Sequence, residues 1–261
     1  MTIYPKHLID RKAAQIPIVI LTAFDYITAH CLESAGVDVI LIGDSLGNVF
    51  AGHDSTHPVT VRDMIYHTQA VKRGAKNSLI ISDMPFLSTQ IDRTEAKRHA
   101  GALIQEAGAG AVKIEVFSEH DILVIEAIIQ MGIPVMGHLG LTPQAVHQLG
   151  GYRKQAVNQA DQDRLFDFCQ RLETVGCFGI VLECVPGSVA KQCKNSVSIP
   201  IIGIGSGSDC DGQVLVTHDL LGLTPGKTPS FAKASTDLYQ QMQHHIGLYK
   251  ESICKTTSTV Q

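Results

Sequence analysis

The sequence contains no Trp, and aromatic residues make up only 5% of its 261 residues. Its charges are nearly balanced, with 21 Lys and Arg against 25 Asp and Glu and a formal net charge of -4. The lack of a basic excess argues against binding to nucleic acid or to an anionic membrane surface. No apolar run approaches the roughly 18 residues of a membrane span, and the first 14 residues have no apolar signal segment. The sequence therefore predicts a cytoplasmic chain that contacts neither membrane nor nucleic acid.

Disulfide and metal-binding cysteine patterns are also missing. The seven cysteines are odd in number and form no C-x-x-C pair, so we expect reduced thiols. They are Cys31, Cys169, Cys177, Cys184, Cys193, Cys210 and Cys254. No H-E-x-x-H, Walker or G-x-G-x-x-G motif occurs, which leaves zinc proteolysis and dinucleotide binding without support.

What the sequence does contain is a repeated unit. Short runs rich in Ile, Val and Leu alternate with longer mixed stretches, and hydrophobic residues reach 44% of the chain. The clear runs are residues 18–21, 37–42, 79–82, 111–114, 133–136, 179–182 and 199–204, and a weaker eighth run is 214–216. Continuous apolar runs are typical of strands that are buried on both faces of a parallel sheet.

The stretches between these runs are predicted to be helices. Residues 92–107, 118–131 and 160–175 each end at a glycine, which is a common helix stop. Eight strand and helix units in about 250 residues indicate a single α/β domain over residues 1–261, a (β/α)₈ TIM barrel, with an open doubly wound sheet as the alternative. A C-terminal helix is predicted near 232–250 and a flexible tail at 251–261.

Three acids end or follow consecutive predicted strands. They are Asp44, Asp83 and Glu115. In a barrel these carboxylates would meet at one mouth, where a divalent cation would relieve their repulsion, and oxygen-only ligands favour Mg²⁺. The alternative is that the acids cap helices or pair with Lys and Arg on the rim.

A cation, an imidazole and a fourth acid are expected at the same mouth. Lys113 shares a strand face with Glu115 and could hold a substrate carboxylate, or the two could form an ion pair. His138 could donate to a substrate oxygen, or be an ordinary polar residue at a strand end. Glu183 follows an apolar run, which would raise its pKa and suit it to act as a base, unless it is bonded to the backbone or to a Lys.

Together these groups predict metal-assisted enolisation. A 2-oxo acid would chelate the metal, the metal would stabilise the enolate, and Glu183 would take the adjacent proton. The residues alone do not identify the electrophile that such a carbon nucleophile would attack.

Motifs along most of the chain resemble those of one enzyme family. They are Thr22-Ala23-Phe24-Asp25-Tyr26, Gly43-Asp44-Ser45-Leu46-Gly47, Gly52-His53-Asp54-Ser55-Thr56, Pro58-Val59-Thr60, Val112-Lys113-Ile114-Glu115, Gly137-His138-Leu139-Gly140-Leu141-Thr142-Pro143-Gln144, Leu182-Glu183-Cys184-Val185-Pro186, Gly203-Ile204-Gly205 and Asp211-Gly212-Gln213. In this order, from about residue 3 to about 250, the chain resembles the 3-methyl-2-oxobutanoate (ketopantoate) hydroxymethyltransferase family.

The resemblance implies a barrel of the phosphoenolpyruvate/pyruvate superfamily and a one-carbon transferase of pantothenate and coenzyme A biosynthesis. In that family 5,10-methylenetetrahydrofolate is the co-substrate that donates a one-carbon unit to 3-methyl-2-oxobutanoate, giving 2-dehydropantoate and tetrahydrofolate through a Mg²⁺-stabilised enolate. Members are commonly homo-oligomers, often decamers.

The resemblance also implies roles for single residues. Asp44 and Asp83 match the magnesium ligands and lie against the substrate, and Glu115 matches the third acid of the metal site, which acts through water. Ser45, Lys113 and His138 match residues that bind the 2-oxo acid. Glu183 matches the catalytic base that removes the C3 proton.

The sequence departs from the family pattern in one loop. Val116-Phe117 stands where many members have two glycines, and the flanks of Gly150-Gly151-Tyr152 also differ, so we expect effects on folate affinity or loop motion before chemistry. Two alternatives stay open. One is a metal-dependent oxo-acid lyase or mutase of the same superfamily, whose K-K-C-G-H loop is absent here, and the other is a catalytically idle barrel.

Overall fold

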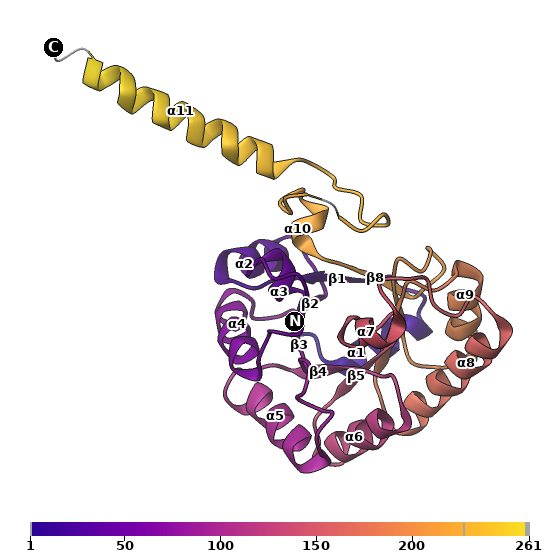
Figure 1. Ribbon diagram of the computed structural model, residues 1–261. Helices are drawn as coiled ribbons and strands as arrows, with labels where there is room; N and C mark the ends of the chain where they lie inside the picture. The colour runs from indigo at the N-terminus through magenta and orange to yellow at the C-terminus, as the bar shows by residue number, and fades with distance from the viewer. Residues whose placement is uncertain (1, 227, 259–261) are drawn as a thin grey trace. The chain divides into compact units, whose positions relative to one another are not determined.

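The computed structural model describes residues 2–226 and 228–258. Eight parallel strands follow one another in chain order and close into a barrel (Figure 1). The strands are β1 (Ile18–Thr22), β2 (Val39–Ile42), β3 (Leu79–Asp83), β4 (Ala111–Glu115), β5 (Val135–Gly140), β6 (Gly179–Glu183), β7 (Ile201–Ile204) and β8 (Gly212–Leu215). The predicted (β/α)₈ barrel is confirmed, and the open doubly wound sheet is excluded.

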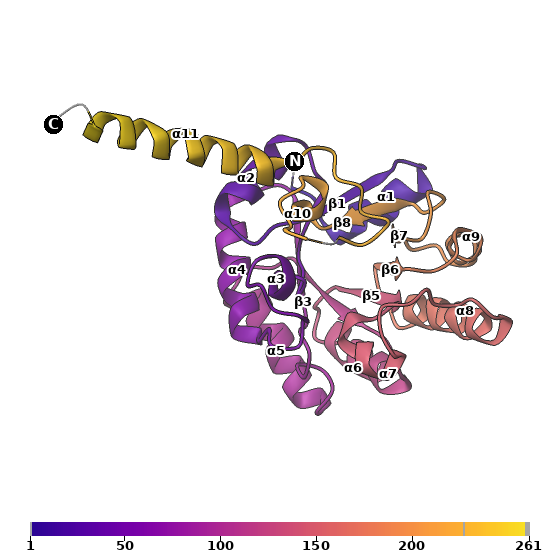
Figure 2. The same cartoon turned by 45° about the horizontal axis from the view of Figure 1, so that its top comes forward.

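Helices surround the strands. In the barrel they are α1 (Pro5–Ala13), α2 (Tyr26–Ser34), α3 (Leu46–Val49), α4 (Val61–Gly74), α5 (Arg93–Gln105), α6 (Glu119–Ile129), the 3₁₀ turn η1 (Pro143–Ala145), α7 (Val146–Leu149), α8 (Gln159–Thr174) and α9 (Gly187–Ser196). Figure 1 shows α4, α5, α6 and α8 outside the strands, and the tilted view of Figure 2 shows α8 and α9 beside β5–β7. The predicted helices 92–107, 118–131 and 160–175 correspond to α5, α6 and α8.

Some strand boundaries differ from the predicted runs. The second strand begins at Val39 and not at Val37, because the Asp38 side chain accepts the backbone N–H of Val19 and pairs with Arg11. The fifth strand begins after Pro134 and continues to Gly140, which brings His138 into the strand itself.

Successive strand residues face alternately the barrel interior and the helices. The inward apolar residues are Ile18, Ile20, Val39, Leu41, Leu79, Ile81, Ala111, Met136, Val181, Ile202 and Val214. Leu8 of α1 is fully buried in the same cluster, and Lys12 donates to the carbonyls of Lys194 and Ile199 and pairs with Asp211. Helix α1 therefore covers the N-terminal ends of the strands and forms an apolar floor.

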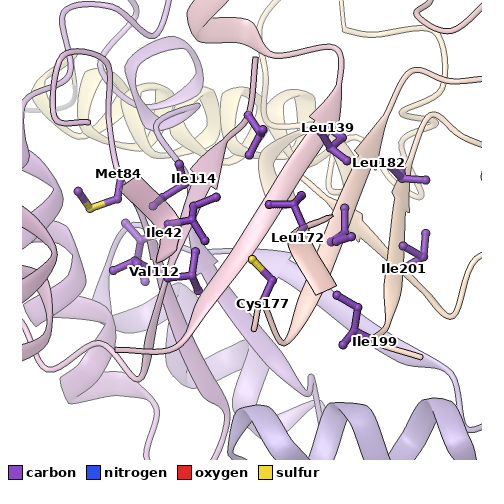
Figure 3. Packing of buried hydrophobic residues seen from close by; sticks show 14 of the residues in the cluster. Ile42, Met84, Val112, Ile114, Leu139, Leu172, Cys177, Leu182, Ile199 and Ile201 are labelled. Atoms are coloured by element: carbon purple, nitrogen blue, oxygen red, sulfur yellow. The ribbon is translucent and has the colours of Figure 1, made fainter. Parts of the chain in front are cut away.

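The residues that face outward form a second, larger core between strands and helices. Figure 3 shows Ile42, Val112, Ile114, Leu182 and Ile201 among the buried side chains of this core. Leu172 of α8 packs so closely over Gly137 that a Cβ there would lie 2.7 Å from a Leu172 methyl carbon. The inward side chains of β3–β6 are apolar near the floor and polar near the C-terminal ends of the strands.

The chain divides into two compact units, Met1–Val214 and Leu215–Gln261. The second unit contains α10 (Thr217–Leu220) and α11 (Leu238–Ser258), and in it the Thr224 hydroxyl donates to Asp219. Among the described residues, no helix is both long and apolar enough to cross a membrane.

Helix α11 is shifted relative to the predicted C-terminal helix at 232–250. It begins at Leu238, because the Asp237 carboxylate accepts the backbone N–H of Gln240 at its first turn, and it continues to Ser258. Residues 251–258 of the predicted tail are thus helical, with Glu251 and Lys255 one turn apart at 3.9 Å. The rest of that tail, residues 259–261, lies outside the described residues.

Candidate active site

The predicted site residues lie together where the inward positions of β2–β6 reach the C-terminal ends of the strands. Asp83 is in register with Lys113 on the neighbouring strand, and Glu115 is in register with His138. Glu183 is in register with Gly140. Because parallel strands in register place inward side chains side by side, four strands contribute to one polar layer above the apolar floor.

Lys113 is the cation of this layer. Its Nζ lies 3.1 Å from Asp83 Oδ1 and 3.2 Å from His138 Nδ1, and the side chain is buried. Burial disfavours the ammonium, but the negative charges of Asp83, Glu115 and Asp44 outweigh burial and raise its pKa. Lys113 therefore stays protonated, as a carboxylate-binding role requires.

The three acids of the proposed metal site are all buried. The backbone N–H of Asp44 donates to Asp83 Oδ2 at 3.1 Å, which joins the first two acids. Burial raises the pKa of Asp83 to about 6 against the lowering effect of Lys113. Burial also raises the pKa of Asp44 and, together with repulsion from Asp44, raises that of Glu115 well above its usual range. The raised pKa values mean that the ionised forms of these buried acids destabilise the folded protein, and a bound cation would offset that destabilisation.

The three acids do not form a complete ligand shell as their side chains stand. Across residues 2–226 and 228–258, no group of three or more His, Cys, Asp or Glu side chains converges closely enough to hold an ion. Mg²⁺ does not need three protein side chains. It dehydrates reluctantly and is commonly bound by one or two carboxylates together with water, which Asp44 and Asp83 could provide.

His138 is neutral, and its tautomer follows from its neighbours. Burial and the charge of Lys113 lower its pKa well below its usual range. Since the Lys113 ammonium can only donate, His138 Nδ1 accepts and the ring proton is on Nε2. Nε2 lies 3.3 Å from Glu183 Oε2 and is buried without a hydrogen-bond partner of good geometry among the described groups. A donor is therefore aimed into the site beside Glu183.

Glu183 has the properties of a base poised near neutral pH. Burial raises its pKa to about 7, although Lys113 opposes the shift. The backbone fixes its position: Gly140 has φ +90°, and a Cβ there would lie 2.3 Å from the Glu183 carbonyl oxygen. Cys184 has the left-handed φ of +51°, held because its N–H donates to Ile204 and its carbonyl accepts from Gln155.

Ser45 directly precedes α3, next to Asp44. Gly43 leaves room for it, since a Cβ on Gly43 would lie 2.8 Å from Ser45 Oγ. All seven predicted site residues therefore lie on neighbouring elements at one end of the barrel: Asp44, Ser45, Asp83, Lys113, Glu115, His138 and Glu183.

One further residue contacts the site without a role predicted for it, and a second, Tyr152, lies close enough to respond to the charges of the site. Gln144, in η1, donates from its side chain to Asp44 Oδ2 and from its backbone to Glu115 Oε2, both at 2.9 Å. Tyr152 is largely exposed, yet burial of its hydroxyl and the charges of Glu183, Asp44 and Glu115 raise its pKa. The sequence feature that could have pointed to Gln144 is its place in the loop just after strand β5, since functional side chains of barrels concentrate in such loops.

The loop that carries Val116-Phe117 is anchored by Asp121. This buried carboxylate accepts the N–H groups of Phe117 and Ser118 at 2.9 and 2.8 Å and the Ser118 hydroxyl at 3.0 Å. Arg164 donates to the Phe117 carbonyl at 2.7 Å. Val116-Phe117, which stands in place of two glycines, therefore lies in a loop held by hydrogen bonds. Its effect on folate affinity stays a prediction.

The Asp121→Ala substitution tests this anchor. We expect the free energy of unfolding to fall by about 1–2 kcal/mol, because two loop N–H groups and the start of α6 lose their acceptor. Urea denaturation of the purified variants measures the change. Ser118→Ala, which removes one hydroxyl contact, should cost less, and an equal cost for both variants would contradict the assignment.

A parallel (β/α)₈ barrel with a buried cluster of ionisable side chains at the C-terminal ends of its strands is the architecture of an enzyme. The family model described as ketopantoate hydroxymethyltransferase matches residues 2–257. The chain belongs to this family of transferases.

Individual relatives agree. The chain is 48% identical over 242 residues to the 3-methyl-2-oxobutanoate hydroxymethyltransferase of Geotalea uraniireducens (strain Rf4), covering 93% of this chain and 90% of the relative. It is 50% identical over 230 residues to the enzyme of the same name from Synechococcus sp. (strain CC9902), covering 86% and 85%. A solved phosphoenolpyruvate phosphomutase from Streptomyces platensis subsp. rosaceus is similar in fold, with a TM-score of 0.64 at 13% identity over 98% of this chain and 88% of that one.

Proposed function

We propose that the chain transfers a hydroxymethyl group from 5,10-methylenetetrahydrofolate to 3-methyl-2-oxobutanoate, giving 2-dehydropantoate and tetrahydrofolate. One water is consumed, and its oxygen becomes the new hydroxyl group. Beyond family membership, the observation that carries the proposal is Glu183, a largely buried carboxyl with a pKa of about 7 beside a neutral imidazole N–H. A base of this kind suits removal of a weakly acidic C–H proton next to a carbonyl.

The acids support binding of Mg²⁺. Asp44 and Asp83 are linked through the Asp44 N–H, both are buried, and their oxygens are hard ligands. Glu115, which Gln144 holds by a backbone N–H, suits a contact through water. Bound there, Mg²⁺ would polarise the carbonyl of the 2-oxo acid and stabilise the enolate charge.

The remaining groups bind the substrate and move its proton. Lys113 supplies a buried positive charge for the substrate carboxylate, and His138 Nε2 supplies a donor for a substrate oxygen. Ser45, next to Asp44 in the chain, supplies a hydroxyl for the 2-oxo acid. Glu183 takes the C3 proton, and the carbon nucleophile bonds to the one-carbon unit of the folate. Both C–N bonds of that carbon break, water supplies its hydroxyl group, and the two nitrogens of tetrahydrofolate take up the protons released by C3 and water. A cytoplasmic location and a homo-oligomer remain predictions from the sequence.

The experiment is a proton NMR time course of 3-methyl-2-oxobutanoate in D₂O with purified protein and Mg²⁺, before and after addition of 5,10-methylenetetrahydrofolate. We expect the C3 proton signal to disappear first and 2-dehydropantoate to form after the folate is added. A parallel sample with a chelator in place of Mg²⁺ should show neither event.

The other outcomes separate the alternatives. Exchange at C3 without product on addition of folate would indicate an oxo-acid enzyme with another acceptor, such as a lyase or mutase. Neither event in folded, Mg²⁺-loaded protein would indicate an idle barrel, and thermal stabilisation by the 2-oxo acid would then be absent as well.

A further inference from the structure

Gln144 connects three of the strand ends that form the site. Its backbone N–H donates to Glu115 Oε2, and its side-chain amide donates to Asp44 Oδ2 and to the Met84 carbonyl at 3.0 Å. It is buried. One residue therefore contacts the chain at the ends of β2, β3 and β4, from which the three acids come.

The amide orientation of Gln144 is fixed by its neighbours. Its nitrogen faces two acceptors, a carboxylate and a carbonyl, so the oxygen cannot occupy that position without repulsion. Its oxygen accepts from Gln90 Nε2 at 3.3 Å, and Gln90 is itself oriented because its oxygen accepts the backbone N–H of Thr89. Each residue in this chain of hydrogen bonds donates to the next: the backbone N–H of Thr89 donates to Gln90, Gln90 to Gln144, and Gln144 to the Asp44 carboxylate.

The backbone carbonyl of Gln144 is held as well. His57 Nε2 lies 2.9 Å from it, and because a carbonyl only accepts, this nitrogen carries the proton. With this bond, the backbone N–H, the backbone carbonyl and both N–H groups of the side-chain amide of Gln144 are all hydrogen-bonded. A buried polar side chain satisfied to this degree is rigid, since any rotation breaks several bonds at once.

We propose that Gln144 is a positioning residue that sets the affinity of the carboxylate site for a divalent cation. It occupies one oxygen of Asp44 and one of Glu115, which fixes the direction in which the other oxygen of each acid points. This inference rests on the proposed function, because it takes Asp44, Asp83 and Glu115 as the metal site.

The test is Gln144→Met, which keeps the length of the side chain and removes both amide donors. We measure Mn²⁺ binding to the metal-free protein from the electron paramagnetic resonance signal of free Mn²⁺, without substrate. We expect the Kd for Mn²⁺ to rise about 10-fold or more, the effect typical of losing a residue that orients metal ligands. Turnover should be recovered largely at high Mg²⁺, so that the Mg²⁺ requirement rises more than kcat falls.

Gln155→Met is the matched control. Among the described residues, the Gln155 amide donates to the Arg153 carbonyl alone, so the Mn²⁺ affinity of this variant should equal that of the wild type. Gln90→Met, which removes one donor to Gln144, should have a smaller effect than Gln144→Met. If Gln144→Met does not fold, as judged by circular dichroism, Gln144→Asn replaces it, because its shorter amide cannot reach Asp44.

The results distinguish two failures. If the wild type binds Mn²⁺ and the folded Gln144 variant binds it equally well, the positioning role is wrong and the proposed function is untouched. If the wild type itself binds no Mn²⁺, the carboxylate site and the role of Gln144 are both overturned.

Discussion

Glu183→Gln is expected to slow exchange of the C3 proton of 3-methyl-2-oxobutanoate by about 10²- to 10⁴-fold, the range typical of losing a general base. Gln has nearly the same shape, so the contact with His138 Nε2 can survive through the amide oxygen. The 2-oxo acid should therefore still bind. Exchange in D₂O measures the rate, and equilibrium binding measures the affinity.

The pH dependence of exchange gives a second check on the same residue. Only the ionised carboxylate accepts a proton, so the rate of the wild type should rise with pH through about 7 and level off above it. The Glu183→Gln variant should lose this rise. Normal exchange in the variant, or a wild-type rate that falls across the same range, would contradict the assignment of Glu183 as the base.

Lys113→Met is expected to lower the free energy of unfolding of the metal-free protein by about 3–5 kcal/mol, the cost of leaving buried charges without their partner. Lys113 faces Asp83, Glu115 and Asp44, and its Nζ is 3.1 Å from Asp83. Urea denaturation in the presence of a chelator measures the loss. Binding of the 2-oxo acid should weaken as well, because its carboxylate loses the cation.

Lys12→Met is the matched control for Lys113→Met. Lys12 is also partly buried and pairs with Asp211, but that carboxylate keeps Lys194 at 3.3 Å and the backbone N–H of Ile201. The loss should therefore be smaller. If the two substitutions cost the same, or if only Lys12→Met weakens substrate binding, the central role of Lys113 is wrong.

The fold and much of the site could be predicted because both depend on local patterns. Apolar runs mark strands buried on both faces, and positions two apart on a strand share a face, which places Lys113 and Glu115 together inside the barrel. The motifs around Asp44, Glu115 and Glu183 then identified the family, which the family model confirms.

The connections made by loops were not predictable in this way. Gln144 reaches Asp44 across 100 residues, because a 3₁₀ turn after β5 brings it over the end of β2. Nothing in the pattern of apolar residues encodes that turn. The capping of α11 by Asp237 and its continuation to Ser258 depend likewise on single contacts, which periodicity does not resolve.

The floor of the barrel also determines the order in which the chain can assemble. Lys12 of α1 donates to the carbonyl of Ile199, 187 residues further along, whereas the acids of the mouth come from the consecutive strands β2, β3 and β4. Contacts between distant residues close large loops and form late, and the N-terminal part of a chain emerges first during synthesis. On the ribosome, the three acids can therefore meet while Lys12 of α1 still lacks its partners Lys194, Ile199 and Asp211, and a nascent chain that stops before Lys194 would hold the three acids without these contacts of the floor.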